Sequence, residues 1–337
     1  MRQTAATGNA RYFFFRHPIF SIAAPALAGA GSASAAERII IATTGKGQPP
    51  EWPDFIATSK GFFAENGVSV ELVAAQSAAA ATMQAAAGSA QMSVGGMTEV
   101  MLGIDHGAKL DLLRIETQVG PYSLFAKRTI KSIKELRGKT VIVGGPKDVT
   151  LVYFQRMAAA NGLKPGDYDL VYAGTTPARL AALTSGSVDA AMLYPPGSFD
   201  AAAQGYPNIG DLSSYVKDMP FTGYAVSDAW ATNNKPAILG FLKAWRKAVD
   251  WFYDPKNRAE AVAILVKESG QSQGNIEKTY DYYRSLHIFP EDGTIDAKNL
   301  TALVQALAQM NTLAGPADPQ RFVNAEMARL NSEAVPK

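Results

Sequence analysis

The chain has 337 residues, of which 47% are hydrophobic and 18% are charged, a composition typical of one large globular domain or two of medium size. The formal charge is +2, and three arginines before residue 37 account for the excess, so the remainder carries 29 basic residues against 30 acidic ones. This near-neutral body excludes nucleic acid as the main expected partner. The absence of cysteine excludes disulfides, thiolate metal sites, cysteine nucleophiles and a lipid anchor on cysteine.

The first 36 residues have the pattern of an export signal. Basic residues extend to Arg16, an apolar run covers 19–30, and small residues precede Glu37. We predict a cleaved signal peptide over 1–36, and therefore a mature chain that is free in the periplasm. The apolar run is too short to span a bilayer and contains Pro25, and no later segment is a transmembrane candidate.

From residue 37 the chain alternates short β-branched runs with helical segments. Strands are expected at 38–42, 68–73 and 91–94, with helices at 52–65 and 78–87. Asn66 and Gly67 end the first of these helices. The order strand, helix, strand, helix, strand is typical of a mainly parallel sheet.

The same order recurs about 100 residues later. Strands are expected at 139–143, 168–172 and 188–193, with helices at 149–160 and 177–184. Both copies end their first helix at an Asn-Gly pair. A duplication of this length is too long for a solenoid repeat and predicts two α/β lobes built on the same plan.

Two extended stretches are expected to link the lobes. The first is 122–127, between the two copies, and the second is 221–226, after which helical patterns continue to the C-terminus. This assigns 37–121 and 226–337 to the first lobe and 122–225 to the second. Two crossings of this kind form a hinge.

The candidate binding site lies in the loops that follow the strands. In open α/β sheets a ligand binds beyond the carboxyl ends of the strands, where loops lead into helices. Aromatic side chains in these loops and crossings can wall a pocket, although local packing is an equal alternative for each. The candidate ligand-binding residues are Gln48, Trp52, Gln76, Ser77, Met97, Thr98, Tyr122, Lys147, Asp148, Val149, Thr150, Tyr194 and Phe221.

The loop 144–150 is the candidate anion site. Two glycines allow its backbone amides to approach a ligand, Lys147 adds a positive charge, and the helix that follows favours an anion at its N-terminus. The alternative is a plain strand-to-helix turn in which Asp148 caps the helix.

The sequence contains no pattern that predicts catalytic, cofactor or metal chemistry. Gly138, Lys139 and Thr140 imitate the end of a phosphate-binding loop, but the upstream glycine is absent and the segment enters a strand. The two histidines after the signal are too far apart in sequence to suggest a metal pair. The carboxylates near the expected crevice form no evident pair, although Glu99 is a candidate for recognising a cationic or amine group.

Three motifs resemble a known family. They are GFFAENGVSVEL at 61–72, SIKELRGK at 132–139 and LTSGSVDA at 183–190. They are similar to the NMT1/THI5-like and the sulfonate-, nitrate- and taurine-type periplasmic solute-binding proteins of ABC importers, over about 39–230. The resemblance implies a type II periplasmic-binding-protein fold, a small-molecule ligand held between two lobes that close on it, and delivery to a membrane permease driven by a separate ATPase.

On this basis we expect a monomeric solute-binding component of an ABC importer that captures a small organic anion, such as a sulfonate or a taurine-like compound. A thiamin pyrimidine precursor, nitrate or an aromatic carboxylate are alternatives within the class, and a periplasmic sensor module is an alternative outside it. Thiamin pyrimidine synthases and aromatic sulfinate desulfinases share the fold, but both depend on cysteine-containing motifs. Because this chain has no cysteine, we do not expect an enzyme.

Overall fold

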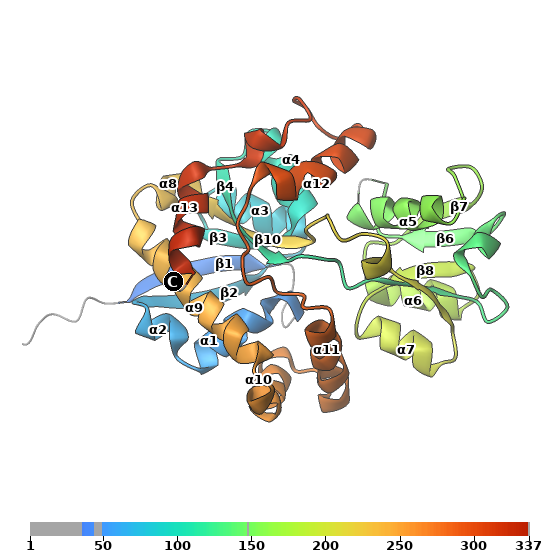
Figure 1. Ribbon diagram of the computed structural model, residues 1–337, viewed down its shortest axis with the longest axis horizontal. Helices are drawn as coiled ribbons and strands as arrows, with labels where there is room; N and C mark the ends of the chain where they lie inside the picture. Colours follow the sequence, from blue (N-terminus) through green and yellow to red (C-terminus); the bar gives the residue numbers. More distant parts are fainter. Residues whose placement is uncertain (1–35, 44–48, 147, 336–337) are drawn as a thin grey trace, which may run out of the picture. The chain divides into compact units, whose positions relative to one another are not determined.

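The computed structural model describes residues 36–43, 49–146 and 148–335. Within the compact unit Ala35–Lys337, two five-stranded sheets, each flanked by helices, form two lobes (Figure 1). The predicted signal peptide, apart from Ala36, lies outside the described residues. Among the helices described, none is both long and apolar enough to cross a membrane.

The sheet of the first lobe is mainly parallel, and one of its five strands, β10, runs antiparallel to its two neighbours. β1 pairs in parallel with β2 and β3, and β10 runs antiparallel to both β3 and β4. Ile39 and Ile41 on β1 are fully buried, as the β-branched pattern predicts. In spatial order the strands are β2 (Val68–Ala74), β1 (Glu37–Thr43), β3 (Met92–Gly96), β10 (Thr222–Ser227) and β4 (Leu110–Thr117).

The sheet of the second lobe repeats this plan. β6 pairs in parallel with β7 and β8, and β5 runs antiparallel to both β8 and β9. In spatial order the strands are β7 (Asp169–Tyr172), β6 (Thr140–Val143), β8 (Ala190–Leu193), β5 (Ser123–Ala126) and β9 (Asn208–Asp211). The duplication predicted from the sequence is therefore confirmed at the level of strand order.

Helices connect the strands and then extend the first lobe. The predicted helix over 52–65 is interrupted at Gly61, whose φ of +74° is a left-handed conformation that glycine adopts without strain. The α-helices are α1 (Trp52–Ser59), α2 (Phe62–Glu65), α3 (Ala78–Ala86), α4 (Met97–Asp105), α5 (Val149–Ala160), α6 (Thr176–Thr184), α7 (Gly197–Ala203), α8 (Asp228–Ala231), α9 (Lys235–Tyr253), α10 (Arg258–Ser269), α11 (Gln273–Ser285), α12 (Ala297–Gln309) and α13 (Ala325–Ala334). Short 3₁₀ turns are η1 (Pro49–Glu51), η2 (Ile133–Leu136), η3 (Leu212–Ser214), η4 (Pro255–Asn257) and η5 (Pro319–Phe322).

The two stretches predicted as crossings are strands instead. Most of 122–127 is β5, and most of 221–226 is β10, so the chain changes lobe just before each of them. Every residue of β5 and β10 is buried, and a buried backbone must find hydrogen-bond partners, which the two sheets supply. Residues 222–225, predicted to belong to the second lobe, therefore belong to the sheet of the first.

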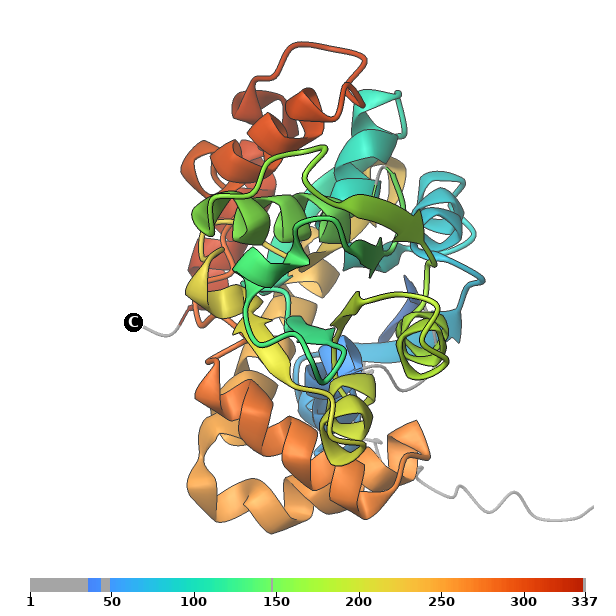
Figure 2. The same ribbon diagram turned by 90° about the vertical axis from the view of Figure 1, so that its right-hand side faces the viewer.

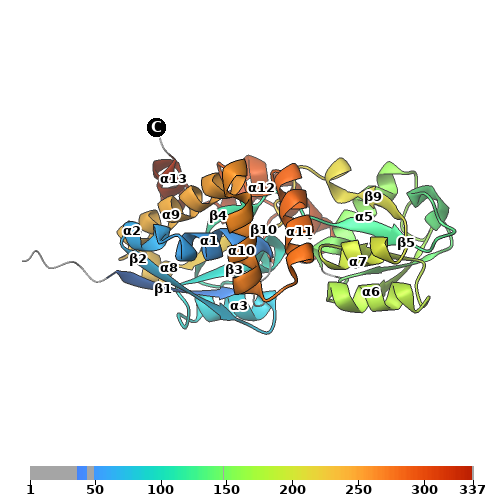
Figure 3. The ribbon, with the colours of Figure 1, turned by 90° about the horizontal axis from the view of Figure 1, so that it is seen from below.

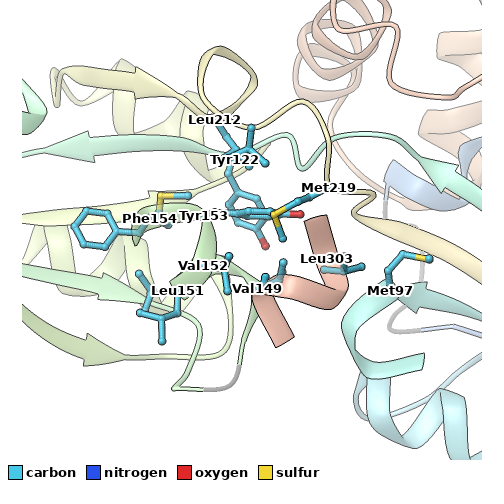
Figure 4. Close-up of a cluster of buried hydrophobic side chains, with 14 of the residues drawn as sticks. Met97, Tyr122, Val149, Leu151, Val152, Tyr153, Phe154, Leu212, Met219 and Leu303 are labelled. Atoms are coloured by element: carbon cyan, nitrogen blue, oxygen red, sulfur yellow. The ribbon is translucent and has the colours of Figure 1, made fainter. Parts of the chain in front are cut away.

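Apolar clusters fill both lobes and the region between them. One cluster packs α9 against α1 through fully buried Trp52 and Trp245. A second cluster includes Met97 from the first lobe, Val149 from the second and Leu303 from α12 (Figure 4). On the other side of the molecule α11 lies beside α7, where the rings of Tyr282 and Phe199 are 6.2 Å apart (Figure 2; Figure 3).

Candidate functional site

A cavity of about 680 Å³ is lined by residues from both lobes. The cavity lies where the sequence predicted it, since residues that follow β1, β2, β3, β6 and β8 line its walls. The contributions that were not predicted come from the loop between β7 and α6, the start of α6 with Arg179, the strand residue Glu116 and the helix residue Tyr283. The volume is in the range of pockets that hold small organic molecules.

The structure divides the predicted site residues into three groups. Those that line the cavity are Gln76, Ser77, Tyr122, Asp148, Val149, Tyr194 and Phe221. Those that are buried away from the cavity are Trp52, Met97, Thr98 and Thr150, each at most 2% exposed. The remaining two, Gln48 and Lys147, lie outside the described residues.

Trp52 illustrates why loop position alone was a poor guide to the cavity. It is the first residue of α1, and its side chain turns toward the core, where its ring lies 5.5 Å from Tyr283 and 6.4 Å from Phe252. Met97, at the start of α4, likewise joins the apolar cluster between the lobes. The first turn of a helix presents only some of its side chains to the crevice, and the others pack inward.

At the predicted anion site, 144–150, side chains of the loop itself accept hydrogen bonds from the backbone amides of Gly144 and Thr150. Asp148 accepts a hydrogen bond from the Thr150 amide at 2.8 Å and caps α5, and the Gly144 amide donates to Thr150 Oγ1 at 2.7 Å. The Asp148 carboxylate thus occupies the helix N-terminus where an external anion was expected. The capped turn, the alternative considered from sequence, is what the structure shows.

The N-terminus of α4 is also occupied by a carboxylate of the chain. Glu99 lies in the first turn of α4 and lines the cavity, and its Oε2 accepts a hydrogen bond from Thr98 Oγ1 at 2.7 Å. Burial raises the pKa of Glu99, and the hydrogen bonds from Thr98 and from the Glu99 backbone oppose this effect. A carboxyl group of the chain therefore occupies the N-terminal turn of both α4 and α5 on the side of the cavity.

Two other helices reach the cavity with neutral caps. Ser77 Oγ accepts a hydrogen bond from the Ala80 amide at 3.1 Å at the start of α3, and Thr175 Oγ1 accepts one from the Ala178 amide at 3.4 Å at the start of α6. First-turn residues of both helices line the cavity. Because first-turn amides have no partner within their helix, these two N-termini keep the positive field that favours an anion.

Arg179 places a positive charge beside the N-terminus of α6. It lines the cavity, and it is held by hydrogen bonds from Nε to the Met192 carbonyl at 2.7 Å, from Nη1 to the Ala173 carbonyl at 2.9 Å and from Nη2 to Thr176 Oγ1 at 2.9 Å. These bonds fix the plane of the guanidinium and use only part of its five N–H groups. An arginine in an otherwise apolar helix was the only sequence signal for this residue.

A buried acidic cluster adjoins the cavity through Glu116. Tyr224 Oη donates to Asp54 Oδ2 at 2.5 Å, lies 3.3 Å from Glu116 Oε1, and accepts from Trp245 Nε1 at 3.0 Å. Burial raises the pKa of Asp54 to about 8, and burial together with the nearby Asp54 raises the pKa of Glu116 well above its usual range. Glu51, 2% exposed and hydrogen-bonded to Thr43, completes this acidic side of the cavity.

Aromatic rings form a third wall. The ring of Tyr122 lies 5.3 Å from that of Tyr194 and 5.6 Å from that of Phe221, both in edge-to-face geometry, and Tyr153 supports it from behind at 6.1 Å (Figure 4). Tyr122, Tyr194 and Phe221 all line the cavity. The cavity therefore combines flat apolar surface with one anion-favouring and one acidic side.

Two α/β lobes of equal strand order, joined by two crossings, with a cavity lined from both, constitute the type II periplasmic-binding-protein fold. The NMT1/THI5-like family matches residues 48–259, and the chain belongs to that family. A search among curated proteins found no match.

Solved structures share the fold at low sequence identity. The periplasmic aliphatic sulphonate binding protein SsuA from Escherichia coli is 18% identical, with a TM-score of 0.71 over 86% of this chain and 92% of that one. The periplasmic nitrate-binding protein NrtA from Synechocystis PCC 6803 is 15% identical, with a TM-score of 0.69 over 89% and 91%. The desulfurization enzyme DSZB is 17% identical, with a TM-score of 0.67 over 88% and 99%, so the fold itself also hosts catalysis.

Proposed function

We propose that the protein is the periplasmic solute-binding component of an ABC importer and that it captures a small organic solute with an anionic group, such as a sulfonate or a taurine-like compound. The observation that carries this proposal is the cavity of about 680 Å³, which both lobes line and which Arg179 and two neutrally capped helices approach. Membership of the NMT1/THI5-like family and the similarity to SsuA and NrtA support the same class. Export by the signal peptide predicted over 1–36 is part of the proposal.

The anionic group is assigned to the space between α3 and α6. The start of α3 belongs to the first lobe, and the start of α6 and Arg179 belong to the second. An anion held there contacts both lobes, and it favours the closed state to the extent that it binds this state better than the open one.

The size and the walls of the cavity favour an organic solute over nitrate. Tyr122, Tyr194 and Phe221 offer ring surface that a four-atom inorganic anion leaves uncovered. A chain of two or three carbons attached to a sulfonate gains burial against these rings, at about 25 cal/mol per Å² of apolar surface removed from water.

A thermal-shift panel tests the proposal. The chain from Glu37 onward, refolded to remove carried ligand, is melted with sulfonates, taurine, nitrate, aminopyrimidines and aromatic carboxylates. A sulfonate or aminosulfonate is expected to raise the melting temperature, because a binder at a hundredfold excess over its dissociation constant adds about 2.7 kcal/mol. A flat response to the whole panel contradicts solute binding of this kind.

Introducing a negative charge at the start of α3 tests whether the anionic group of the solute binds there. Ser77→Asp keeps a good helix cap but adds a carboxylate like those of α4 and α5, so we expect anion affinity to fall at least about tenfold while the unliganded protein stays folded. Ser272→Asp makes the same change at the start of α11, where Ser272 caps an exposed helix end, and is the matched control. Equal affinity in Ser77→Asp and the control rejects the assigned anion site.

The enzyme and sensor alternatives have separate tests. DSZB shows that a protein of this fold can be an enzyme, and consumption of any ligand during prolonged incubation would support that alternative here. For transport, permease and ATPase genes are expected beside the gene of this protein. A membrane sensor kinase in that position would instead support a sensory role.

A further inference from the structure

The cavity is more acidic than an anionic ligand alone explains. Among the described residues that line it, four are carboxylates and Arg179 is the one cation. Two of the carboxylates, Asp148 and Glu99, are engaged at the starts of their own helices. Glu116 lies in a strand, and Glu51, although it precedes α1, makes no side-chain cap and is hydrogen-bonded to Thr43.

Glu116 has hydrogen-bonding capacity that the described residues do not use. It is fully buried in β4, its Oε1 lies 3.3 Å from Tyr224 Oη, and its Oε2 has no hydrogen-bond partner among the described residues. An unsatisfied buried carboxylate oxygen is costly, and native structures contain few of them. Because Glu116 lines the cavity, a ligand is the available source of the missing donor.

Tyr283 provides a second observation from an unrelated element. This residue of α11 is fully buried and lines the cavity, and its hydroxyl also has no partner in the described part of the chain. Tyr194, Glu116 and Tyr122, which act electrostatically on this hydroxyl together with Tyr282, line the same cavity. The ring is held in place by Trp52 at 5.5 Å.

We infer that Glu116, Glu51 and the hydroxyl of Tyr283 form a subsite for a protonated nitrogen, so that the solute is a small zwitterion with an amine at this end and its anionic group at α3 and α6. This inference rests on the proposed solute-binding function and narrows its ligand class. An ammonium group brings three N–H donors, which matches a site of carboxylate and hydroxyl oxygens. Amine-free sulfonates and nitrate offer no N–H donor to Glu116 Oε2 and the Tyr283 hydroxyl.

The electrostatics of Glu116 agree with this role. Burial raises the pKa of Glu116, so without a ligand its neutral form is favoured. A cation placed against it favours the ionised form, and the pair then gains the strength of a charge-assisted hydrogen bond in a dry site. Selectivity for amines follows because only a cationic group supplies that compensation.

Matched ligand pairs test the inference by titration calorimetry. The pairs are taurine with ethanesulfonate and 3-aminopropanesulfonate with propanesulfonate, which differ only in the amine. The amine-bearing member of a pair is expected to bind at least about tenfold more tightly. Glu116→Gln, which keeps the shape of the side chain, is expected to weaken the amine-bearing members about 10- to 100-fold and to leave the amine-free members within about twofold.

Two further variants guard against a purely structural effect. Tyr283→Phe removes only the hydroxyl, and it is expected to weaken the amine-bearing members selectively even if Glu116→Gln does not fold. Glu71→Gln removes an exposed carboxylate of β2, so both members of each pair should bind it as they bind the unmodified protein. Melting temperatures without ligand establish that each variant is folded.

The outcomes separate this inference from the function on which it rests. If ethanesulfonate binds as tightly as taurine, or if Glu116→Gln and Tyr283→Phe weaken both members of a pair equally, the amine subsite is rejected while solute binding stands. If no member of either pair binds, and no anion or aminopyrimidine of the wider panel raises the melting temperature, the proposed function and the subsite are rejected together.

Discussion

Asp54, Glu116 and Tyr224 form a buried polar group whose hydrogen bonds are incompletely satisfied. Asp54 Oδ1 has no partner among the described residues, and one tyrosine proton serves two carboxyl groups. A protein selected only for stability gains from replacing such a group by apolar side chains. Because Glu116, a member of this group, lines the cavity, we interpret the group as giving up stability to shape the charge of the site.

Asp54 makes folding stability depend on pH. Its pKa of about 8 in the folded protein exceeds the usual 3.8, so between these values the folded state holds a proton that the unfolded state has lost. The stabilising contribution is therefore complete below the unfolded pKa and is lost as the pH rises through the folded pKa. From pH 5 to pH 9 we expect the free energy of unfolding to fall by about 4 kcal/mol through this residue. Glu116, whose pKa is shifted in the same direction, adds to the fall.

Urea unfolding at the two pH values measures this effect. Asp54→Asn cannot ionise, so its loss of stability between pH 5 and pH 9 should be smaller than that of the unmodified chain by about the same 4 kcal/mol. Asp169→Asn changes an exposed aspartate at the start of β7 and should retain the full pH dependence. Parallel pH curves for Asp54→Asn and the unmodified chain are incompatible with a buried, protonated Asp54.

At the scale of elements, helix N-termini contribute in two different ways to the electrostatics of the cavity. Helices α3, α4, α5 and α6 all direct N-termini toward it, but only α4 and α5 carry a carboxylate in that position. A serine or threonine cap leaves the helix field positive, and an acidic cap reverses it. The charge pattern of the site is therefore decided by one side chain per helix.

Helix packing in the first lobe depends on a glycine in α9. A Cβ atom added at Gly240 would lie 2.4 Å from the carbonyl oxygen of Asn66, a backbone atom that cannot rotate away. Alanine normally stabilises a helix interior by about 1 kcal/mol relative to glycine. We expect Gly240→Ala to lower the free energy of unfolding by about 1–3 kcal/mol instead, because the helix must move away from α2.

The matched control for this change is Gly274→Ala in α11. No atom lies within 4 Å of a Cβ built there, so only the helix propensity changes, and stability should be unaltered or rise by up to about 1 kcal/mol. Denaturant unfolding of both variants at one pH gives the comparison. Stabilisation by both substitutions would show that α9 does not approach the Asn66 carbonyl so closely.

The elements of both lobes could be predicted because their signals are local. Hydrophobic periodicity and the Asn-Gly helix ends lie within single elements, and they gave the positions along the chain of the three parallel strands of each lobe correctly. The crossings were misplaced because β5 and β10 owe their strand character to neighbours far along the chain, which no local pattern reveals.

The site was predicted in outline and missed in detail for a related reason. Loops at strand ends follow from topology, but whether Trp52 or Met97 faces the cavity depends on the core behind it. The prediction considered only loops at strand ends. It therefore missed Arg179 in α6, Glu116 in β4 and Tyr283 in α11.

At the scale of the whole compact unit, binding and movement are expected to be coupled. The assigned anionic end lies between helices of different lobes, and the lobes are joined by only two crossings. A ligand that satisfies both α3 and α6 at once must favour the arrangement in which the two lie closest. The apolar cluster that includes Leu303 and the contact between α11 and α7 limit where the lobes can pivot.

Closure can be measured with two spin labels because the chain has no native cysteine. Met83→Cys on α3 and Tyr172→Cys on β7 replace exposed side chains of different lobes, which are 64% and 47% exposed. With the panel member that stabilises the protein most, we expect the distance distribution between the labels to shift to shorter values. The pair Val73→Cys and Met83→Cys lies within the first lobe and should give an unchanged distribution. If both pairs are unchanged at saturation, the ligand binds without bringing α3 and α6 together, and the anionic end must be held by one lobe alone.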